Sequence, residues 1–298
     1  MTTVQNAAGA GVVSLLPLYR ERNVLNTVVC IKQVPDTTQV RIDPETNTLV
    51  REGIPAIINP FDLHAIEAAA RIKERYGGTC TLLCMGPPQA VEALQKALSF
   101  GADRAILLSD RALIGSDTLA TSAALAAGIR KLGQEQPVDL VLCGKQTIDG
   151  DTAQVGPGIA TRLGITQITY VGAVESIDLE ARRLRARRIL EGAEEIVEAP
   201  LPALLTVLKE IGEPRYASLP AVIVGLRTEI PIWGIGDIDL DESEVGLAGS
   251  PTQVRRIFAP PQRERGELLT ADDGNPGRAA NLLLDKLLAD GVFEEPAS

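Results

Sequence analysis

The chain has 298 residues, enough for one large domain or two small ones, and 45% of them are hydrophobic, so a sizeable core can be buried. The formal charge of −10 argues against a nucleic-acid-binding surface, because such surfaces need clustered Lys and Arg to displace counterions. Four cysteines and one histidine argue against a structural metal site and a disulfide framework, and they favour a reducing compartment such as the cytoplasm.

Residues 1–24 contain a short apolar run at 11–18 that Pro17 interrupts and that no cationic side chain precedes. This run does not fit a signal peptide, so we predict a disordered N-terminal extension. No apolar run in the sequence approaches the length of a transmembrane helix, and we expect no direct membrane insertion.

From residue 26 onward, short apolar runs rich in β-branched residues alternate with segments whose apolar residues recur at helical spacing. The predicted strands span residues 26–32, 79–85, 104–108 and 138–143, with a pair of short strands within 40–51. The predicted helices span residues 60–76, 89–100, 118–132 and 152–163, and the third of them follows a polar cap at Gly115-Ser116-Asp117. Strands that alternate with helices predict an α/β fold with a doubly wound, mostly parallel sheet.

The pattern changes after residue 166. The segments at 167–176, 184–190 and 203–207 read as strands without full helices between them, and they predict an antiparallel addition to the sheet. The basic stretch at 181–188 alternates with apolar residues, which is typical of the exposed face of a strand.

Prolines and glycines become frequent beyond Tyr216. We therefore expect an extended C-terminal arm that builds little core of its own and ends in a short helix near 278–289. The predicted organisation is an α/β nucleotide-binding domain at 25–215, followed by a docking segment and arm at 216–298 that pack on a partner subunit.

Three loops at the carboxyl ends of predicted strands are unusual, and ligands of open α/β sheets bind beyond those ends. They lie at 30–36, 85–88 and 144–157. In the last loop Gly144 and Gly150 allow a ligand to approach the backbone closely, and Asp151 and Thr152 are suitable N-caps for the following helix. The free N–H groups at the start of such a helix favour a phosphate or pyrophosphate; an ordinary capped turn is the alternative.

The run Gly144-Lys145-Gln146-Thr147 does not fit a P-loop, which needs Gly where Asp139 stands and Ser or Thr where Gln146 stands. Asn59 and Pro60 fit the N-cap and first position of a helix, and the same residues could close over an adenosine; both interpretations can hold. His64 is a lone helical histidine, to which we assign no role.

At these loops the sequence resembles the beta subunits of electron transfer flavoproteins. The resemblance rests on CIKQVPD, INPFDLHAIEAA, the MGPP turn, GADRAILLSD, CGKQTIDGDTAQVGP and EPRYASLP, which occur in the family's order over roughly residues 26–263. It implies an adenine nucleotide alpha hydrolase-like fold, a heterodimer with a larger alpha subunit that carries FAD, and a second adenine nucleotide, FAD or AMP, in the beta subunit.

The resemblance also implies roles for individual residues. The cofactor-binding residues would be Cys30, Asn59, Pro60, Phe61, Asp62, Met85, Gly144, Lys145, Gln146, Thr147, Asp149, Gly150, Asp151, Thr152, Ala153, Gln154 and Val155. Tyr216, Leu219 and Pro220 would dock a partner dehydrogenase, with Leu219 as the apolar anchor; a packed loop leucine is the alternative. No catalytic side chain and no metal are expected, since the flavin performs the redox chemistry.

Two subtypes of the family come into question. AMP-type members pass single electrons from acyl-CoA dehydrogenases toward a quinone oxidoreductase. Electron-bifurcating members hold FAD in the beta subunit, oxidise NADH in complex with the alpha subunit, and divide the electrons between a low-potential acceptor, such as ferredoxin or flavodoxin, and a high-potential one. Asp62 stands where the mitochondrial type has Cys, and residues 54–62, 85–88 and 249–254 are more similar to the bifurcating group, which we favour.

Two other classes of protein were weighed. A stand-alone ATP-binding sensor similar to universal stress proteins would not need the Pro-rich arm after Tyr216. An ATP-dependent ligase or sulfurtransferase would need an N-terminal pyrophosphate loop rich in Ser and Gly, and residues 33–39 do not provide one.

Overall fold

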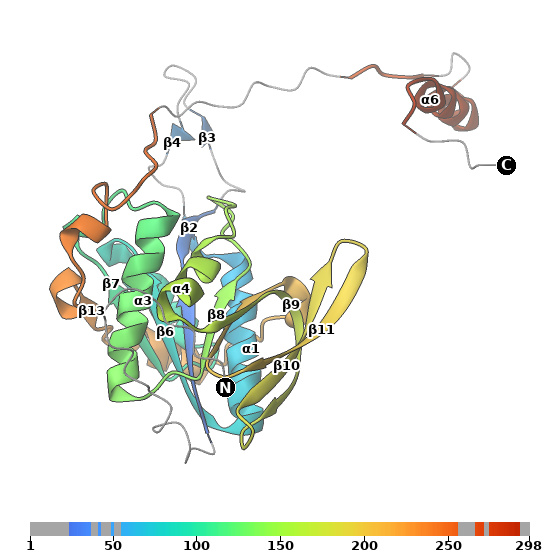
Figure 1. The fold of residues 1–298 in the computed structure, drawn as a ribbon. Coiled ribbons are helices and arrows are strands. Elements are labelled where there is room, and N and C mark those ends of the chain that lie inside the picture. The colour runs from blue at the N-terminus through green and yellow to red at the C-terminus, as the bar shows by residue number, and fades with distance from the viewer. Residues whose placement is uncertain are drawn as a thin grey trace, which may run out of the picture. The chain divides into compact units, whose positions relative to one another are not determined.

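The computed structural model describes residues 24–36, 41–42, 49–50, 55–255, 266–270 and 274–292. The chain divides into two compact units, residues 1–257 with the α/β fold and residues 258–298, whose described part contains the helix α6 (Pro276–Ala289) (Figure 1). This helix agrees with the one predicted at 278–289. The predicted extension at 1–24 lies outside the described residues, apart from Val24.

In the described part of the chain, nine strands form one sheet in the order β11-β10-β9-β12-β8-β1-β6-β7-β13. Their bounds are β1 (Leu25–Ile31), β6 (Gly78–Met85), β7 (Arg104–Leu108), β8 (Leu140–Gly144), β9 (Thr166–Asp178), β10 (Arg183–Leu190), β11 (Ala193–Pro200), β12 (Ala203–Val207) and β13 (Ile232–Trp233). All neighbours from β9 to β13 in this order are parallel, whereas β10 pairs antiparallel with both β9 and β11. A mostly parallel sheet with an antiparallel addition is thereby confirmed.

The strand order reverses at β1. The chain moves outward from β1 through β6 and β7, and then crosses back to β8 on the other side of β1. Val29 of β1 accordingly has Leu82 of β6 and Leu142 of β8 as its register partners. Ligands of doubly wound folds bind at the carboxyl ends of the strands beside such a reversal, and these ends lie at the top of the sheet in Figure 1.

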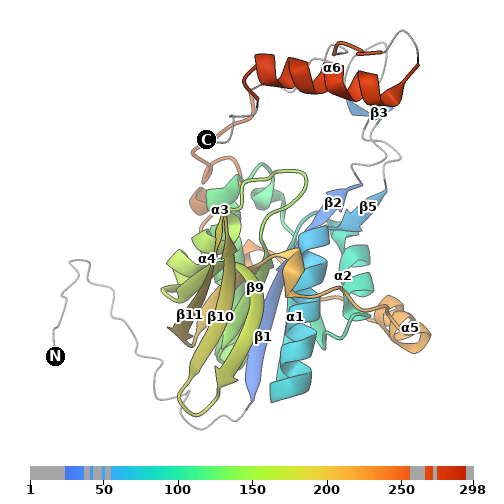
Figure 2. The same ribbon diagram turned by 90° about the vertical axis from the view of Figure 1, so that its right-hand side faces the viewer.

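Helices cover both faces of the sheet. Figure 2 shows α1 (Pro60–Tyr76) and α2 (Val91–Leu98) on one side and α3 (Thr118–Glu135) and α4 (Val155–Leu163) on the other. Side chains of a strand alternate between faces, so Cys80 and Cys84 of β6 pack in the core on the α1 side and Leu83 packs on the α3 side. The four cysteines are buried and free, and Cys80 and Cys84 lie on the same face of β6.

The antiparallel part differs from the prediction in two strands. The segment at 203–207 was grouped with the antiparallel addition, but β12 is parallel and lies between β8 and β9. Every residue of β12 is buried, and its run Ala-Leu-Leu-Thr-Val is typical of a parallel strand covered on both faces. β11 was not predicted, because its glutamates and mostly exposed side chains do not give the apolar alternation of a strand.

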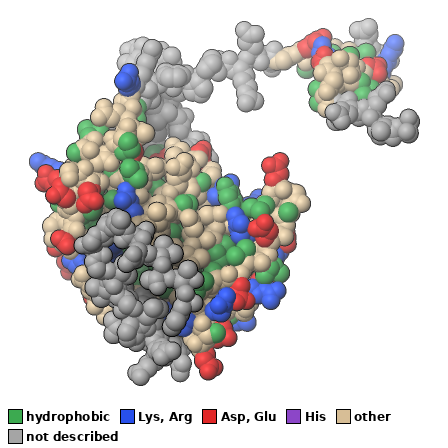
Figure 3. Space-filling model, viewed as in Figure 1, with side chains coloured by type: hydrophobic (Ala, Val, Ile, Leu, Met, Phe, Trp, Pro, Cys, Tyr) green, Lys and Arg blue, Asp and Glu red, His purple; other side chains and the backbone are tan. Residues whose placement is uncertain are grey.

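The basic stretch at 181–188 lies largely on β10, as predicted. Arg183 and Arg185 are exposed, whereas Leu184 and Ala186 between them are buried. Carboxylates of β9 and β11 bind three of the arginines, in the pairs Arg183–Glu198, Arg187–Glu175, Arg187–Glu194 and Arg188–Glu195. Acidic and basic side chains accordingly lie next to one another on this side of the molecule (Figure 3), and the stretch is not an isolated cationic patch.

The chain beyond Tyr216 contributes more core than we predicted. The helix α5 (Leu219–Arg227) lies beside α2 in Figure 2, and β13 extends the sheet at β7. Ile230, Ile238 and Val245 are buried against the α/β unit. These apolar residues are too widely spaced to give a periodic pattern, so only tertiary contacts reveal their burial.

The remaining elements are short. The pair of strands predicted within 40–51 is found as β3 (Arg41–Ile42) and β4 (Leu49–Val50), and β2 (Gln33–Pro35) pairs with β5 (Ala56–Ile58). Single-turn 3-10 helices are η3 (Pro88–Ala90), η4 (Arg111–Leu113), η5 (Lys209–Ile211), η6 (Ile235–Asp237) and η7 (Glu242–Glu244). Among the described helices, none combines the length and the apolar character needed to cross a bilayer.

Candidate functional site

A cavity of about 550 Å³ lies at the carboxyl ends of β1, β6, β7 and β8, beside the reversal of strand order. Four loops and the helices α1, α3 and α4 supply its walls. The lining residues are Cys30, Ile31, Lys32, Gln33, Asp62, Met85, Gly86, Pro87, Leu113, Gly115, Ser116, Asp117, Thr118, Thr121, Leu125, Cys143, Gly144, Lys145, Gln146, Thr147, Gly150, Thr152, Ala153, Gln154, Val155 and Gly156. Its size is within the range of small-molecule and cofactor sites.

Most of the residues predicted from the sequence to bind a cofactor meet at this cavity. Those that line it are Cys30, Asp62, Met85, Gly144, Lys145, Gln146, Thr147, Gly150, Thr152, Ala153, Gln154 and Val155. Those that do not are Asn59, Pro60, Phe61, Asp149 and Asp151. The binding role of every one of these residues remains a prediction, but the second group reaches the cavity only through other residues.

The helix after β8 begins later than we predicted, and its cap differs. The expected helix at 152–163 starts at Val155, with Gln154 at the N-cap position and no side-chain cap. Asp151 and Ala153 have φ angles of 52° and 55°, and this left-handed backbone keeps the chain out of the helix until Gln154. Asp151 therefore does not cap the helix; it accepts a hydrogen bond from Nε2 of Gln146 at 2.8 Å and folds the loop back on itself.

Asn59 holds this loop in place from the start of α1. Its side chain is fully buried; Nδ2 donates to the carbonyl of Gln146 at 2.9 Å, and Oδ1 accepts from the amide of Ile148 at 3.2 Å. The predicted N-cap position is confirmed, but the side chain makes no capping bond to its own helix. Asn59 thus positions the cavity wall and does not face the cavity.

Asp62 joins the carboxyl ends of β1 and β8 at the reversal of strand order. Its carboxylate accepts from the amide of Lys32 after β1 at 2.8 Å and from the amide of Gly144 in β8 at 3.2 Å. Burial raises the pKa of Asp62 to about 7, although hydrogen bonds from Asn59, Lys32 and Gly144 oppose the shift. Near neutral pH this cavity-lining carboxyl group is therefore partly protonated.

Gly144 is required by this arrangement. A Cβ atom at this position would lie 2.7 Å from Cβ of Phe61 and would also collide with Oδ1 of Asp62. The start of α1 therefore packs directly against the backbone at the end of β8. Because of this contact, Pro60 and Phe61 lie next to the site but do not line the cavity.

Two lysines provide the positive charge of the lining. Nζ of Lys32 pairs with Oδ2 of Asp149 at 2.6 Å, and Nζ of Lys145 lies 5.3 Å from the ring centroid of Tyr170. Although partial burial opposes it, hydrogen bonds from Lys32 and Thr147 lower the pKa of Asp149. Both cations suit an anionic ligand such as a phosphate, because each can leave its present partner without unfolding any element.

The loop between β7 and α3 is a wall of the cavity that the sequence analysis missed. Asp117 caps α3, as predicted, by accepting from the amides of Leu119 and Ala120 at 2.9 and 3.1 Å. Its second oxygen binds the amide and hydroxyl of Thr252. The sequence did contain a signal for this wall, because Gly115-Ser116-Asp117 follows a third parallel strand at the same edge of the sheet. These three residues were interpreted only as a helix cap.

The residues predicted to dock a partner dehydrogenase lie on a different surface. Tyr216 is fully exposed and Leu219 is 73% exposed, so Leu219 is not the packed loop residue of the alternative interpretation. Leu219 and Pro220 form the first turn of α5 and not a loop, and the hydroxyl of Ser218 caps this helix. Arg215 fixes the preceding segment, since its backbone and guanidinium nitrogens bind the carboxylate of Glu67 on α1.

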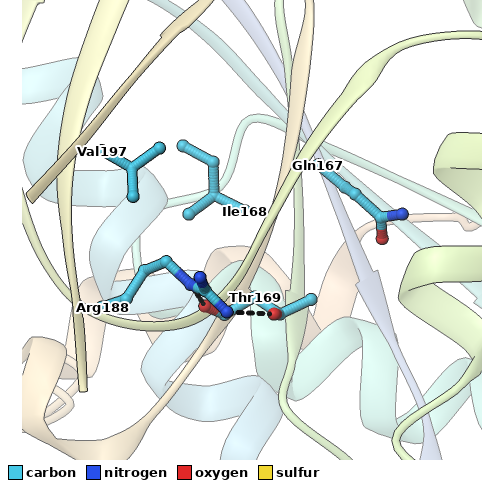
Figure 4. Close-up of a pocket in the computed structure, with 5 residues that line it drawn as sticks. All are labelled: Gln167, Ile168, Thr169, Arg188 and Val197. Atoms are coloured by element: carbon cyan, nitrogen blue, oxygen red, sulfur yellow. Dashed lines mark hydrogen bonds between the residues drawn. The ribbon is translucent and has the colours of Figure 1, made fainter. Parts of the chain in front are cut away.

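A second hollow of about 260 Å³ is lined by Gln167, Ile168, Thr169, Arg188 and Val197 (Figure 4). Figure 4 shows Arg188 turned toward Thr169, with which it forms hydrogen bonds of 2.8 and 3.2 Å. Its remaining nitrogen binds Glu195 at 2.9 Å. Since the guanidinium already has protein partners, this small hollow offers less to an anionic ligand than the larger cavity.

Residues 46–226 match the electron transfer flavoprotein domain. The chain is 50% identical to Protein FixA of Azotobacter vinelandii, over 88% of this chain and 94% of that protein. It is 49% identical to the electron transfer flavoprotein subunit beta of Clostridium acetobutylicum, over 82% and 92% of the two chains. It is 48% identical to the caffeyl-CoA reductase-Etf complex subunit CarD of Acetobacterium woodii, over 88% and 98%. These similarities, together with a cavity at the reversal of the sheet, show that the chain belongs to the electron transfer flavoprotein family, among its beta subunits.

Proposed function

We propose that this chain binds an adenine nucleotide, FAD in preference to AMP, in the cavity beside β1 and β8, and that it carries electrons together with an alpha subunit. One observation supports the proposal above all others. The cavity lies where the strand order reverses, and the loop at 144–156 borders it with glycines, backbone groups and the first turn of α4. Such a wall suits a pyrophosphate, because the first N–H groups of a helix have no partner within it.

The residues present fit such a group. Gly144 and Gly156 line the cavity without a side chain, so their backbone forms part of the wall, and Lys32 and Lys145 can neutralise phosphate charge. Apolar lining from Met85, Leu113 and Leu125 suits a flat ring system. A bound flavin would supply the electron-accepting and electron-donating chemistry; the protein contributes binding, orientation and electrostatics.

The preference for FAD rests on the extent of the cavity. Its lining continues past the loops after β1, β6 and β8 to the loop after β7, where Gly115, Ser116, Thr118 and Thr121 add hydroxyl and backbone groups. A mononucleotide at the loop after β8 would leave this second wall without a ligand. AMP remains the competing ligand, and with it a carrier that does not bifurcate electrons.

The partners follow from the relatives. Names such as electron transfer flavoprotein subunit beta and Etf complex subunit support a heterodimer with an alpha subunit. With FAD in this chain, we propose electron bifurcation, in which NADH supplies electrons that are divided between ferredoxin or flavodoxin and a higher-potential acceptor such as a quinone oxidoreductase or an acyl-CoA dehydrogenase. Exposed Tyr216 and Leu219 would dock the dehydrogenase.

Nucleotide content tests the proposal directly. The chain would be co-expressed with its alpha subunit, the purified complex precipitated, and the released nucleotides identified by chromatography. Two FAD per heterodimer are expected. One FAD with one AMP would refute bifurcation and retain the family role, whereas a complex without an adenine nucleotide in this chain would refute the assignment of the cavity.

A further inference from the structure

Two cysteines lie side by side on the floor of the cavity. Cys30 of β1 and Cys143 of β8 are register partners on adjacent parallel strands, and both line the cavity. They also belong to the same apolar cluster, on the α3 side of the sheet, so their side chains point to the same face. The exposed fractions are 7% and 6%, and the cavity accounts for their contact with solvent.

The other two cysteines of the chain are arranged differently. Cys80 and Cys84 pack in the cluster on the opposite face of the sheet and do not line the cavity. Burial raises the pKa of each to about 12, and a reagent that enters the cavity does not reach either thiol. Strand register and the shared face of the sheet place the Cys30 and Cys143 side chains next to each other, and a hydrogen bond with Cys30, together with burial, raises the pKa of Cys143 above its usual value.

The spacing of the strands brings this pair close to disulfide geometry. Neighbouring strands lie about 4.8 Å apart, which is within the Cα separations of about 4.4–6.8 Å found in disulfides. The Cβ atoms of a disulfide lie about 3.8 Å apart, so strands at this spacing must approach by about 1 Å. Asp62 binds the amides of Lys32 and Gly144, close to both cysteines, and already holds these two strand ends together.

We propose that Cys30 and Cys143 form a dithiol site that a low-molecular-weight disulfide oxidises through the open cavity, and that a nucleotide bound in the cavity blocks this reaction. One cysteine loses its proton to solvent, and its sulfur bonds to one sulfur of the reagent. The S–S bond of the reagent breaks, one half leaves as a thiol, and the other half stays on the cysteine as a mixed disulfide. The second cysteine then displaces the other half of the reagent as a second thiol. The two cysteine thiols are oxidised to one disulfide, and the reagent is reduced to two thiols, so protons and electrons balance.

The oxidised pair would oppose nucleotide binding in return. The disulfide draws the ends of β1 and β8 together beneath the ligand, and these strands carry two of the loops that line the cavity. The part of the proposal that concerns protection rests on the nucleotide site proposed above. The formation of the disulfide does not, because it needs only the two cysteines and the cavity.

The test uses the full-length chain freed of nucleotide, with 2-hydroxyethyl disulfide as the oxidant. Remaining thiols are alkylated under denaturing conditions, and cross-linked peptides are identified by mass spectrometry. Two of the four thiols should disappear, with one cross-link between Cys30 and Cys143. Saturation with AMP at 100 times its dissociation constant should slow the reaction by about 100-fold, because only the free protein reacts.

Matched variants complete the experiment. Cys80→Ala and Cys84→Ala should still form the cross-link, whereas Cys30→Ala and Cys143→Ala should not. No cross-link in the wild type, or one that survives either of the last two substitutions, would overturn the dithiol site. A reaction as fast with bound AMP as without it would overturn access through the cavity. Failure of AMP to bind at all would instead count against the proposed nucleotide site, and the cross-link would still decide the dithiol site.

Discussion

Replacement of Asn59 by alanine tests whether the cavity wall is built as the contacts indicate. The side chain is fully buried and binds the carbonyl of Gln146 and the amide of Ile148, both in the loop after β8. Alanine removes both bonds and the hydrogen bond to Asp62, and it leaves two backbone groups of the loop without these partners. Each lost bond costs about 1 kcal/mol, and a buried group left unsatisfied costs more, so we expect a loss of about 2–4 kcal/mol in the free energy of unfolding.

The same substitution should weaken nucleotide binding, although Asn59 does not line the cavity. A loosened loop must be ordered again when the ligand binds. If about 2 kcal/mol of that ordering is required at binding, the affinity falls about 30-fold. Urea unfolding gives the change in stability, and calorimetric titration with AMP gives the change in affinity.

Gln95→Ala is the matched control for this experiment. It removes an amide of α2 that donates to Thr228 at 3.1 Å, outside the cavity. We expect a smaller loss of stability and no change in the dissociation constant of AMP. If Asn59→Ala retained full affinity for AMP while the control behaved as expected, the loop would not depend on Asn59, and our account of the wall would be wrong.

Three further substitutions test other contacts. Gly144→Ala should destabilise the fold by about 1–3 kcal/mol in thermal unfolding, because the new Cβ meets Phe61 and Asp62. The control Gly133→Ala in α3, where the Cβ meets open space, should raise the melting temperature. Equal effects of the two substitutions would contradict the packing at Gly144. For Asp62 the pKa of about 7 in the folded protein lies above the ordinary value of 3.8, so its contribution to stability is present below about pH 4 and lost as the pH rises to about 7. Urea unfolding across this range should show the wild type losing up to about 4 kcal/mol relative to Asp62→Asn; a constant difference would refute the burial argument. Glu67→Ala leaves Arg215 without its buried partner, and trypsin should cut after Arg215 faster than in the wild type; an unchanged rate would show that the ion pair does not hold this segment.

The parallel half of the fold could be predicted well because its signals are local. The strand at 104–108 and the helix at 60–76 match β7 and α1 at both ends. The antiparallel strand β11 could not be predicted, because its glutamates pair with arginines of the neighbouring strand β10, and such pairs are not visible in the local sequence. The start of α4 was also predicted too early, because nothing local distinguishes Asp151 as a left-handed residue from Asp151 as a cap.

The amino-acid sequence alone establishes which loops gather at one edge of the sheet, because parallel strands carry their following loops to the same side whatever their order. It also determined the family, through runs of residues such as those at 144–157. What each side chain does there depends on contacts between distant parts of the chain. Asn59 and Asp62 act on partners more than 80 residues away, and Cys30 meets Cys143 through strand register, so no local pattern could assign these contacts.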